Sequence, residues 1–213
     1  KYRKRINDQL RKLGASCDWS RSVFTLDEGP QEAVRTTFAS LYEDGKIYRG
    51  PRIINWCPRC LTALSDLEVD HLEVPGNFWH VRYPFLNSEG REQPDGIVIA
   101  TTRPETIPAD IAIAVHPNDE RWKDVIGQTV SLPLPGITRA LPILADDSVD
   151  VEIGTGALKI TPGHDPLDFE IGERHGLEAI RAIDWDGSMT AASGPYEGLD
   201  RNMAKERIVA DLD

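Results

Sequence analysis

The sequence predicts an α+β fold, in which a compact, β-barrel-like body with peripheral helices follows a small helical and extended lead-in segment. Two observations support this prediction. From Phe78 onward, short stretches of alternating apolar and polar residues lie between prolines and glycines, which is the period-two pattern of half-buried strands. Before that point, apolar residues recur at helical spacing. The change falls near Val74 to Gly76, so we expect a lead-in over residues 1–75 and a β-rich body over residues 76–213.

The lead-in is predicted to contain two helices. The first exposes a basic face and ends at Gly14, and the second opens at Pro30 and ends at Gly45. The apolar stripe of the second helix consists of Val34, Phe38, Leu41 and Tyr42. Residues 47–49 and 53–56 are predicted to form short extended pieces.

The body is predicted to consist mainly of short strands. They are expected at residues 78–85, 97–100, 111–115, 129–134, 141–144, 158–161 and 180–183. A last helix follows Asp200, which is a suitable N-cap, and turns Ala204, Ile208 and Leu212 inward.

Length and charge limit the classes of function. A chain of 213 residues can bury a sizeable core, and it contains no apolar run of membrane-spanning length and no signal-peptide pattern. It does not begin with methionine, so we expect a piece of a longer protein. The net charge of −11 argues against a broad nucleic-acid-binding surface, because phosphate contacts need clustered Lys and Arg. A basic cluster within the first twelve residues leaves a narrow surface possible, although we favour a solvated helix face as its explanation.

Cys57 and Cys60 form a Cys-x-x-Cys pair that looks like a zinc knuckle. A structural zinc site needs four ligands, and this pair supplies two. Cys17 and His71 could complete a site, but nothing in their spacing requires it, so we expect no zinc unless a ligand pair comes from outside this chain. Three cysteines do not make a disulfide scaffold and fit a reducing compartment, which favours a cytoplasmic location.

The densest group of ionisable and turn-forming residues lies between Gly154 and Gly176. Lys159 and Thr161 alternate with apolar neighbours, so the strand pattern sends both side chains to one face. Asp165 followed by proline is a helix-start signature, and Gly176 is suited to end that helix.

The turn before this helix gathers His164, Asp165 and Asp168 where backbone N–H groups point outward, and such a place can hold a small polar ligand. Capping and the helix dipole would also explain the two carboxylates on structural grounds alone. This stretch by itself therefore leaves both a functional and a purely structural interpretation open.

A second polar cluster directly follows the strand predicted at residues 97–100. Its members are Thr101, Thr102, Arg103, Glu105 and Thr106. Hydroxyl groups and one planar cation at the end of a strand suit a ribose and a phosphate. An ordinary hydroxyl-rich turn is the alternative.

Together these motifs resemble the editing insertion, or connective peptide 1, of the class I aminoacyl-tRNA synthetases for valine, isoleucine and leucine. The residues concerned are Thr-Thr-Arg-Pro-Glu-Thr at 101–106, Gly-Thr-Gly-Ala at 154–157 and Pro-Gly-His-Asp at 162–165. The resemblance covers nearly the whole chain. Asn-Trp-Cys-Pro at 55–58, Ala-Val-His-Pro at 114–117 and Lys-Ile-Thr-Pro at 159–162 look most like the valine enzymes, many of which lack the cysteine pair.

The resemblance implies a role for each candidate residue. Asp168 would bind the α-ammonium group of a misattached amino acid. The side chain of that amino acid and the attacking water would lie in a pocket shaped by Lys159, Thr161, His164 and Asp165. The terminal adenosine and its ester would be held by Thr101, Thr102, Arg103, Glu105 and Thr106.

The resemblance also implies what the chain does not do. The family's signatures for adenylate formation, His-x-Gly-His and Lys-Met-Ser-Lys-Ser, are absent from the sequence. We therefore expect the chain to edit but not to synthesise, with no cofactor of its own and with ATP and Mg acting elsewhere in the parent enzyme. The expected partners are the 3′ end of tRNA(Val) and the rest of the synthetase, with no membrane.

The leading hypothesis is hydrolysis of threonine esters on tRNA(Val), because a pocket shaped for valine is known to reject isosteric threonine only weakly. One alternative is the corresponding domain of an isoleucine enzyme, which would act on valine esters. Another is a non-catalytic module that positions the tRNA 3′ end, which the net charge of −11 disfavours. We place the selectivity on Lys159 and Thr161, and we expect Asp168 to be a surface carboxylate whose loss leaves the fold nearly intact.

Overall fold

The computed structural model describes residues 2–213, which form a first compact unit ending at Arg52 and a second unit, Ile53–Asp213. The first unit contains α1 (Tyr2–Lys12), a 3-10 turn η1 (Trp19–Arg21) and α2 (Glu28–Glu43). Both predicted helices are therefore present. The second one starts two residues before Pro30, which is tolerated because the first N–H groups of a helix have no partner within it.

The apolar stripe of α2 is not covered within the first unit. Val34, Phe38 and Tyr42 are 67%, 57% and 62% exposed. Residues 47–49, which were predicted to be extended, form no strand. No helix in the described part of the chain is long and apolar enough to cross a membrane.

The second unit begins with a hairpin of β1 (Asn55–Cys57) and β2 (Thr62–Leu64), followed by the 3-10 turn η2 (Asp66–Glu68). Trp56 fastens the hairpin to the body, because its ring lies 4.7 Å from that of Trp185 and its Nε1 donates to Trp185 O at 2.7 Å. The compact units therefore divide at residue 52, and the change of sequence texture near residue 75 lies inside the second unit.

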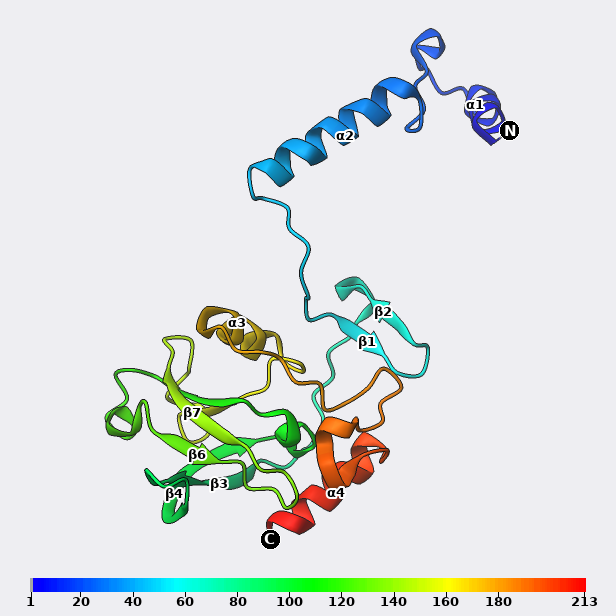
Figure 1. Cartoon of the computed structure of the whole chain (residues 1–213). Helices are drawn as coiled ribbons and strands as arrows, with labels where there is room; N and C mark the ends of the chain where they lie inside the picture. The colour runs from blue at the N-terminus through cyan, green and yellow to red at the C-terminus, as the bar shows by residue number, and fades with distance from the viewer. Residues whose placement is uncertain (1) are drawn as a thin grey trace. The chain divides into compact units, whose positions relative to one another are not determined.

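The body is one curled sheet of six strands in the order β4-β3-β6-β7-β5-β8 (Figure 1). The strands are β3 (Trp79–Leu86), β4 (Glu92–Thr101), β5 (Ala112–Val115), β6 (Thr129–Ser131), β7 (Ala140–Ala145) and β8 (Ala157–Ile160). Only β5 and β7 run parallel. The edge strands β4 and β8 contact each other, so the sheet curls toward a closed barrel and confirms the predicted fold class.

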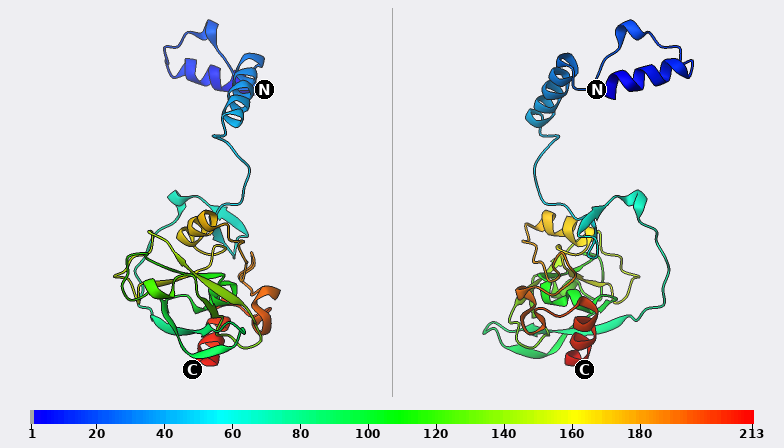
Figure 2. Two further views of the ribbon diagram at one scale, coloured as in Figure 1. Left: turned by 60° about the vertical axis from the view of Figure 1, so that its left-hand side comes forward. Right: turned by 90° about the vertical axis from the view of Figure 1, so that its right-hand side faces the viewer.

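Two helices, α3 (Pro166–His175) and α4 (Arg201–Leu212), lie at opposite ends of this body (Figures 1 and 2). Between strands and helices lie the 3-10 turns η3 (Pro104–Ala109), η4 (Lys123–Val125) and η5 (Ala191–Tyr196). Asp200 caps α4 by accepting from Asn202 N, and Ala204 and Ile208 are fully buried, as predicted.

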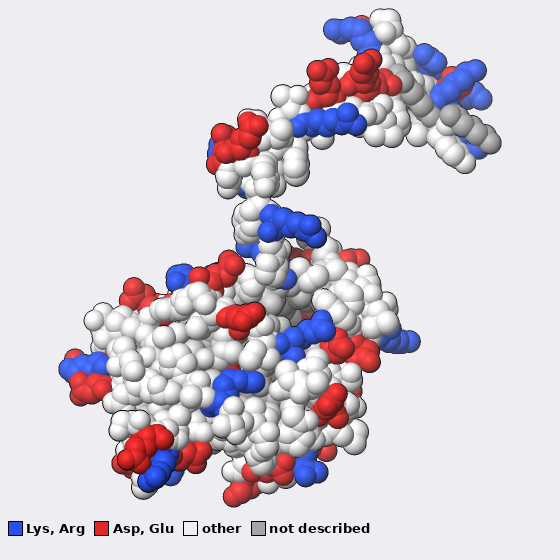
Figure 3. Space-filling model, in the orientation of Figure 1, with Lys and Arg blue, Asp and Glu red and all other residues white. Residues whose placement is uncertain are grey.

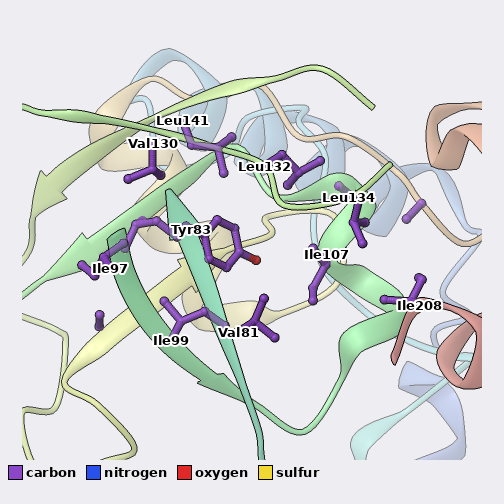
Figure 4. Packing of buried hydrophobic residues seen from close by; sticks show 14 of the residues in the cluster. Val81, Tyr83, Ile97, Ile99, Ile107, Val130, Leu132, Leu134, Leu141 and Ile208 are labelled. Atoms are coloured by element: carbon purple, nitrogen blue, oxygen red, sulfur yellow. The ribbon is translucent and has the colours of Figure 1, made fainter. Parts of the chain in front are cut away.

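The main core fills the inside of the curl. Val81 and Tyr83 of β3 lie beside their register partners Ile99 and Ile97 of β4, and Ile208 of α4 belongs to the same cluster (Figure 4). Alternate residues of β3 and β4 are buried, which is the period-two pattern that predicted these strands. The core thus holds α4 against η3, the turn into which the threonine-rich segment, residues 101–106, leads.

The strand predicted at residues 180–183 is wrong, because only an isolated bridge between Ile183 and Met189 forms there. The backbone N–H groups of Ala182 and Ile183 donate instead to the imidazole Nε2 of His164, at 2.9 and 3.4 Å. A side chain from the predicted site therefore takes the hydrogen bonds that a neighbouring strand would have used.

Candidate functional site

Lys159 and Thr161 come from the end of β8 and share one face, as their spacing predicts. Both are almost fully buried, at 7% and 1% exposure. Lys159 Nζ donates to Thr161 Oγ1 at 2.6 Å, to Thr106 Oγ1 at 2.7 Å and to Asp110 Oδ1 at 3.1 Å. An ammonium group has three N–H donors, so Lys159 has none left for a ligand.

Asp110 completes this buried cluster from the other side. It is fully buried and accepts hydrogen bonds from Lys159, from the Thr161 hydroxyl at 2.5 Å and from the Tyr83 hydroxyl at 2.6 Å. Burial raises the pKa of Asp110, while the Lys159 ammonium group and the hydroxyl donors oppose that rise. Burial and the Asp110 charge also raise the pKa of Tyr83, which keeps its hydroxyl protonated as a donor.

Asp168 lies at the start of α3 and is buried, with 5% exposure, so the expectation of a surface carboxylate was wrong. Its Oδ2 accepts from Thr161 N at 2.8 Å, and no described residue donates a side-chain hydrogen bond to it. Burial raises its pKa to about 7, and the charges of Asp165 and Asp110 add to the rise that Lys159 and the Thr161 N–H oppose. The fold thus buries a carboxylate without a cation from the described residues in direct contact.

Asp165 is the N-cap of α3, as predicted, and its Oδ1 accepts from Leu167 N at 2.8 Å and from Asp168 N at 3.2 Å. Capping occupies only Oδ1, and no hydrogen bond to Oδ2 is present among the described residues. The structural role of this carboxylate is therefore compatible with a second role in the pocket.

His164 is held in one protonation state. Two backbone N–H groups donate to its Nε2, so that nitrogen is an acceptor and the ring proton resides on Nδ1. Burial and, after it, the charges of Arg103, Lys159 and Arg181 lower the pKa of His164 to about 4. The preceding Gly163 leaves no room for a side chain, since a Cβ there would lie 2.4 Å from Ile180 O.

The threonine-rich segment follows β4 and leads into η3. Arg103 links it to the turn after β8, because its Nη1 donates to His164 O at 2.8 Å. The Thr106 hydroxyl donates to Arg103 O at 2.9 Å, and Lys205 of α4 donates to Thr102 O at 3.1 Å. The hydrogen bond to His164 O therefore connects the threonine-rich segment with the turn after β8 and fixes Arg103 beside that turn.

These segments enclose a pocket of about 240 Å³. Nine of the ten predicted site residues line it: Thr101, Thr102, Arg103, Thr106, Lys159, Thr161, His164, Asp165 and Asp168. Phe78, Ala100, Ile153, Leu158 and Leu167 supply its apolar wall. On the face of the second unit drawn in Figure 3, basic side chains are interspersed with acidic ones.

Glu105 is the predicted residue that does not line the pocket. Its Oε1 lies 3.5 Å from Arg103 Nε, and its Oε2 is buried without a hydrogen-bond partner among the described residues. Asp110 and Tyr83 were missed by the sequence predictions. The only available signal was an acidic residue between apolar neighbours at the start of β5.

The Gly-Thr-Gly-Ala motif shapes the loop that leads into β8. A Cβ on Gly156, whose φ is +73°, would lie 2.2 Å from Arg121 Nη2. Arg121 pairs with Asp119 at 2.6 Å and donates to Val151 O at 2.7 Å, and Trp122 Nε1 donates to Thr155 O at 2.9 Å. These contacts account for the glycine as a packing requirement of the pocket's rim.

The predicted zinc knuckle lies in the turn between β1 and β2, where Cys60 N donates to Cys57 Sγ at 3.4 Å. Cys17, which belongs to the first unit, is exposed. Among residues 2–213, no group of three or more potential ligands is arranged to hold a metal ion. The expectation that zinc does not bind unless a ligand pair comes from outside this chain stays a prediction.

Comparison with known proteins gives a family and close relatives. The family model of class I tRNA synthetases (I, L, M and V) matches residues 1–185. The valine–tRNA ligase of Clostridium tetani is 54% identical over 211 residues, which are 99% of this chain and 23% of that protein. That of Syntrophotalea carbinolica is 55% identical over 208 residues, or 98% of this chain and 22% of that protein. The chain therefore spans less than a quarter of these relatives.

One solved structure, described as the crystal structure of GlLeuRS-CP1, superimposes with a TM-score of 0.47 and 14% identity. The match covers 63% of this chain and 94% of that one. A likeness at this level has no bearing on function.

Proposed function

We infer the function from one premise: this chain belongs to the class I tRNA synthetases of the isoleucine, leucine, methionine and valine group. On that premise we propose that it is the editing part of a valine–tRNA ligase. It would hydrolyse the ester that joins misattached threonine to tRNA(Val). The 54% and 55% identity to valine–tRNA ligases supports the valine system over the isoleucine system.

The observation that supports hydrolytic editing most strongly is Asp168, a buried carboxylate that lines the pocket without a cationic partner in contact. An aminoacyl ester carries an α-ammonium group, which would supply the missing charge and hydrogen bonds. Because burial raises the pKa of Asp168 to about 7, binding an ammonium group would also pull that pKa down and favour the ionised form.

The rest of the pocket suits the other parts of such an ester. Arg103 lies at the rim with its side chain 47% exposed, where its guanidinium can reach a phosphate, and Thr101 and Thr102 offer hydroxyl groups beside it. The Nδ1–H of His164 is a neutral donor on the turn that lines the pocket. These groups would hold the terminal adenosine and the ester.

Hydrolysis of an ester needs little more than a positioned water and a polarised carbonyl group. The water oxygen forms a bond to the ester carbon, the bond to the ribose oxygen breaks, and that oxygen leaves with a proton. Free threonine and uncharged tRNA are the products. The partners are therefore tRNA(Val) and the remainder of the synthetase, whose ATP-dependent and Mg-dependent synthesis would lie outside these residues in a cytoplasmic enzyme.

The test is a deacylation assay on the full-length synthetase that contains this chain, with threonyl-tRNA(Val) and valyl-tRNA(Val) compared side by side. We expect rapid loss of the threonyl ester and slow loss of the valyl ester. Hydrolysis of neither ester, with binding of the tRNA 3′ end retained, would instead support the non-catalytic alternative. Faster hydrolysis of a valyl ester on tRNA(Ile) would support the isoleucine alternative.

A further inference from the structure

The buried cluster beneath the pocket allows a complete count of its hydrogen-bond donors. Lys159 donates its three N–H hydrogen bonds to Thr106, Asp110 and Thr161. Since Lys159 can only donate, the Thr161 oxygen must accept from it, and the Thr161 proton must go to another acceptor. That acceptor is Asp110 Oδ1, at 2.5 Å.

The remaining two hydroxyl groups are fixed in the same way. Thr106 accepts from Lys159 and donates its own proton to Arg103 O. Tyr83 donates to Asp110 Oδ2 at 2.6 Å, on the side of the carboxylate away from Thr161. Every donor proton in this cluster is therefore used inside the cluster or by the main chain, whereas Thr106 and Thr161 each keep one oxygen lone pair.

Asp110 is well placed to impose this arrangement because its backbone is itself anchored. Its N–H donates to Ile107 O at 2.9 Å, and its carbonyl oxygen accepts from Arg139 Nη1 at 3.0 Å. It does not line the pocket, whereas Thr106, Lys159 and Thr161 do. Asp110 can therefore act on a ligand only through the residues that it orients.

We propose that Asp110 is a positioning residue that makes the pocket floor an acceptor of hydrogen bonds, so that the floor selects ligands whose side chain donates one. The floor is the cluster of Thr106, Lys159 and Thr161. This inference rests on the proposed editing function and names what distinguishes its two esters. Threonine's γ-hydroxyl group donates a hydrogen bond to the floor, and valine's methyl group leaves the same lone pair unpaired.

The inference differs from a floor in which Lys159 donates directly to the substrate. In that case, a halogen, which is a weak acceptor without a proton, would still satisfy the site better than a methyl group does. If Asp110 instead accepts the Thr161 and Lys159 protons, only a ligand group that donates a hydrogen bond gains binding energy from the floor. The two arrangements therefore predict opposite results for a substrate of the same size that cannot donate.

The first experiment uses the unmodified full-length synthetase that contains this chain, so it does not depend on the folding of any variant. tRNA(Val) esterified with threonine, valine or 2-amino-3-chlorobutyrate is supplied, and the three hydrolysis rates are compared. Chlorine has about the volume of a methyl group and no proton. We expect the chloro ester to be hydrolysed about tenfold or more slowly than the threonyl ester, the factor for one lost hydrogen bond, and no faster than the valyl ester. A chloro ester that is hydrolysed clearly faster than the valyl ester would overturn the proposal.

The second experiment varies Asp110 and follows the ratio of threonyl to valyl ester hydrolysis. In Asp110→Ala the Thr161 proton has lost its inward acceptor, so the ratio should fall about tenfold or more. The amide oxygen of Asp110→Asn can still accept that proton, so the ratio should fall less. A drop in both rates at an unchanged ratio would mean that Asp110 is only structural. Asp146→Asn, which replaces a comparably buried carboxylate outside the pocket, should leave the ratio unchanged.

The outcomes separate this inference from the proposed function. If the synthetase that contains this chain hydrolyses neither the threonyl nor the valyl ester, the editing function itself is wrong. If it hydrolyses the threonyl ester selectively but hydrolyses the chloro ester clearly faster than the valyl ester, editing stands and the role of Asp110 is wrong.

Discussion

Two aspartates lie at opposite ends of α3, and the comparison between them separates a structural carboxylate from a functional one. Asp168 lies at the first turn of α3, and Asp146 contacts the last turn. They are 5% and 7% exposed, so their burial is nearly equal. Their pKa values nevertheless shift in opposite directions.

The difference lies in the partners. Asp146 accepts from Arg174 Nε and Nη2 at 3.1 and 2.8 Å, from Ser148 N at 3.0 Å and lies 3.0 Å from His175 Nε2. Burial raises the pKa of Asp146, but these hydrogen bonds outweigh it and hold the pKa well below its usual range. Among the described residues, Asp168 has one backbone donor to its side chain and no contacting cation. At nearly equal burial, Asp146 is therefore fully hydrogen-bonded and links its loop to the end of α3. Asp168 keeps unused hydrogen-bonding capacity with which it can bind a ligand.

The largest effect is expected for Asp168→Asn and Asp168→Ala, which should slow hydrolysis of the threonyl ester about a hundredfold or more. Both variants remove the charge that would pair with the α-ammonium group. The free energy of unfolding should not fall with the activity, because ionised Asp168 destabilises the folded state. Because the folded-state pKa is raised to about 7, the stabilising protonated form is present at low pH and lost as pH rises toward 7.

Asp168→Asn imitates that protonated form and keeps an acceptor for Thr161 N–H. Its free energy of unfolding in urea should therefore be no lower than that of the unmodified chain at pH 8. Unchanged hydrolysis in a folded Asp168 variant would end the idea that this carboxylate anchors the ammonium group.

The converse is expected for Asp146→Ala, which should lower the free energy of unfolding by about 2 kcal/mol and leave hydrolysis nearly unchanged. Since the folded-state pKa of Asp146 is depressed, its contribution is fully present above the ordinary aspartate pKa of about 3.9 and is lost as pH falls below it. Urea unfolding at pH 7 and pH 3 measures this loss. A more than tenfold drop in hydrolysis by the folded variant would contradict the division of roles.

Thr161→Val tests whether the hydroxyl group of Thr161 selects the side chain of the ester without acting on Asp168. The backbone N–H that holds Asp168 survives this change, but the hydroxyl group is lost while the side-chain volume is kept. We expect the threonyl ester to be hydrolysed about tenfold more slowly, a loss of about 1–2 kcal/mol, with the valyl ester little affected. Equal slowing of both esters, measured as kcat/KM, would assign Thr161 to the shared chemistry instead.

The sequence predicted the local parts of this site because their causes are local. The helix cap at Asp165 and the common face of Lys159 and Thr161 follow from residues within a few positions of one another. The pocket's two halves could be joined only through a family resemblance. Nothing in the local pattern connects Arg103 with the turn at His164, 61 residues away.

Asp110 shows where such prediction stops. Its contacts to Lys159 and Thr161 span 49 and 51 residues, and its own neighbours resemble an ordinary strand start. The burial of Asp168 is equally non-local, because it depends on how α3 packs against β8. A helix-start pattern predicts a cap and a dipole, but it does not reveal whether the first turn faces water or a pocket.

The smallest effect is expected at His164, and it tests which group gives the pocket its pH dependence. If Asp168 must be ionised to bind the ester, kcat/KM should rise with pH up to about 7, where the pKa of Asp168 lies. An imidazole with an ordinary pKa of about 6.5 would give a similar rise. The pKa of His164 is lowered to about 4, so His164 stays neutral throughout this range.

His164→Gln distinguishes the two explanations, because glutamine can keep an acceptor near Ala182 N but has no group that titrates. We expect the rise in kcat/KM to remain centred near pH 7, with the rate at the plateau reduced by less than about tenfold through loss of the Nδ1 donor. The variant should also be relatively more stable than the unmodified chain at pH 5 than at pH 8. The lowered pKa of His164 contributes stability above pH of about 6.5 and loses it as pH falls toward 4. Disappearance of the rise near pH 7 would make His164, and not Asp168, the titrating group of the pocket.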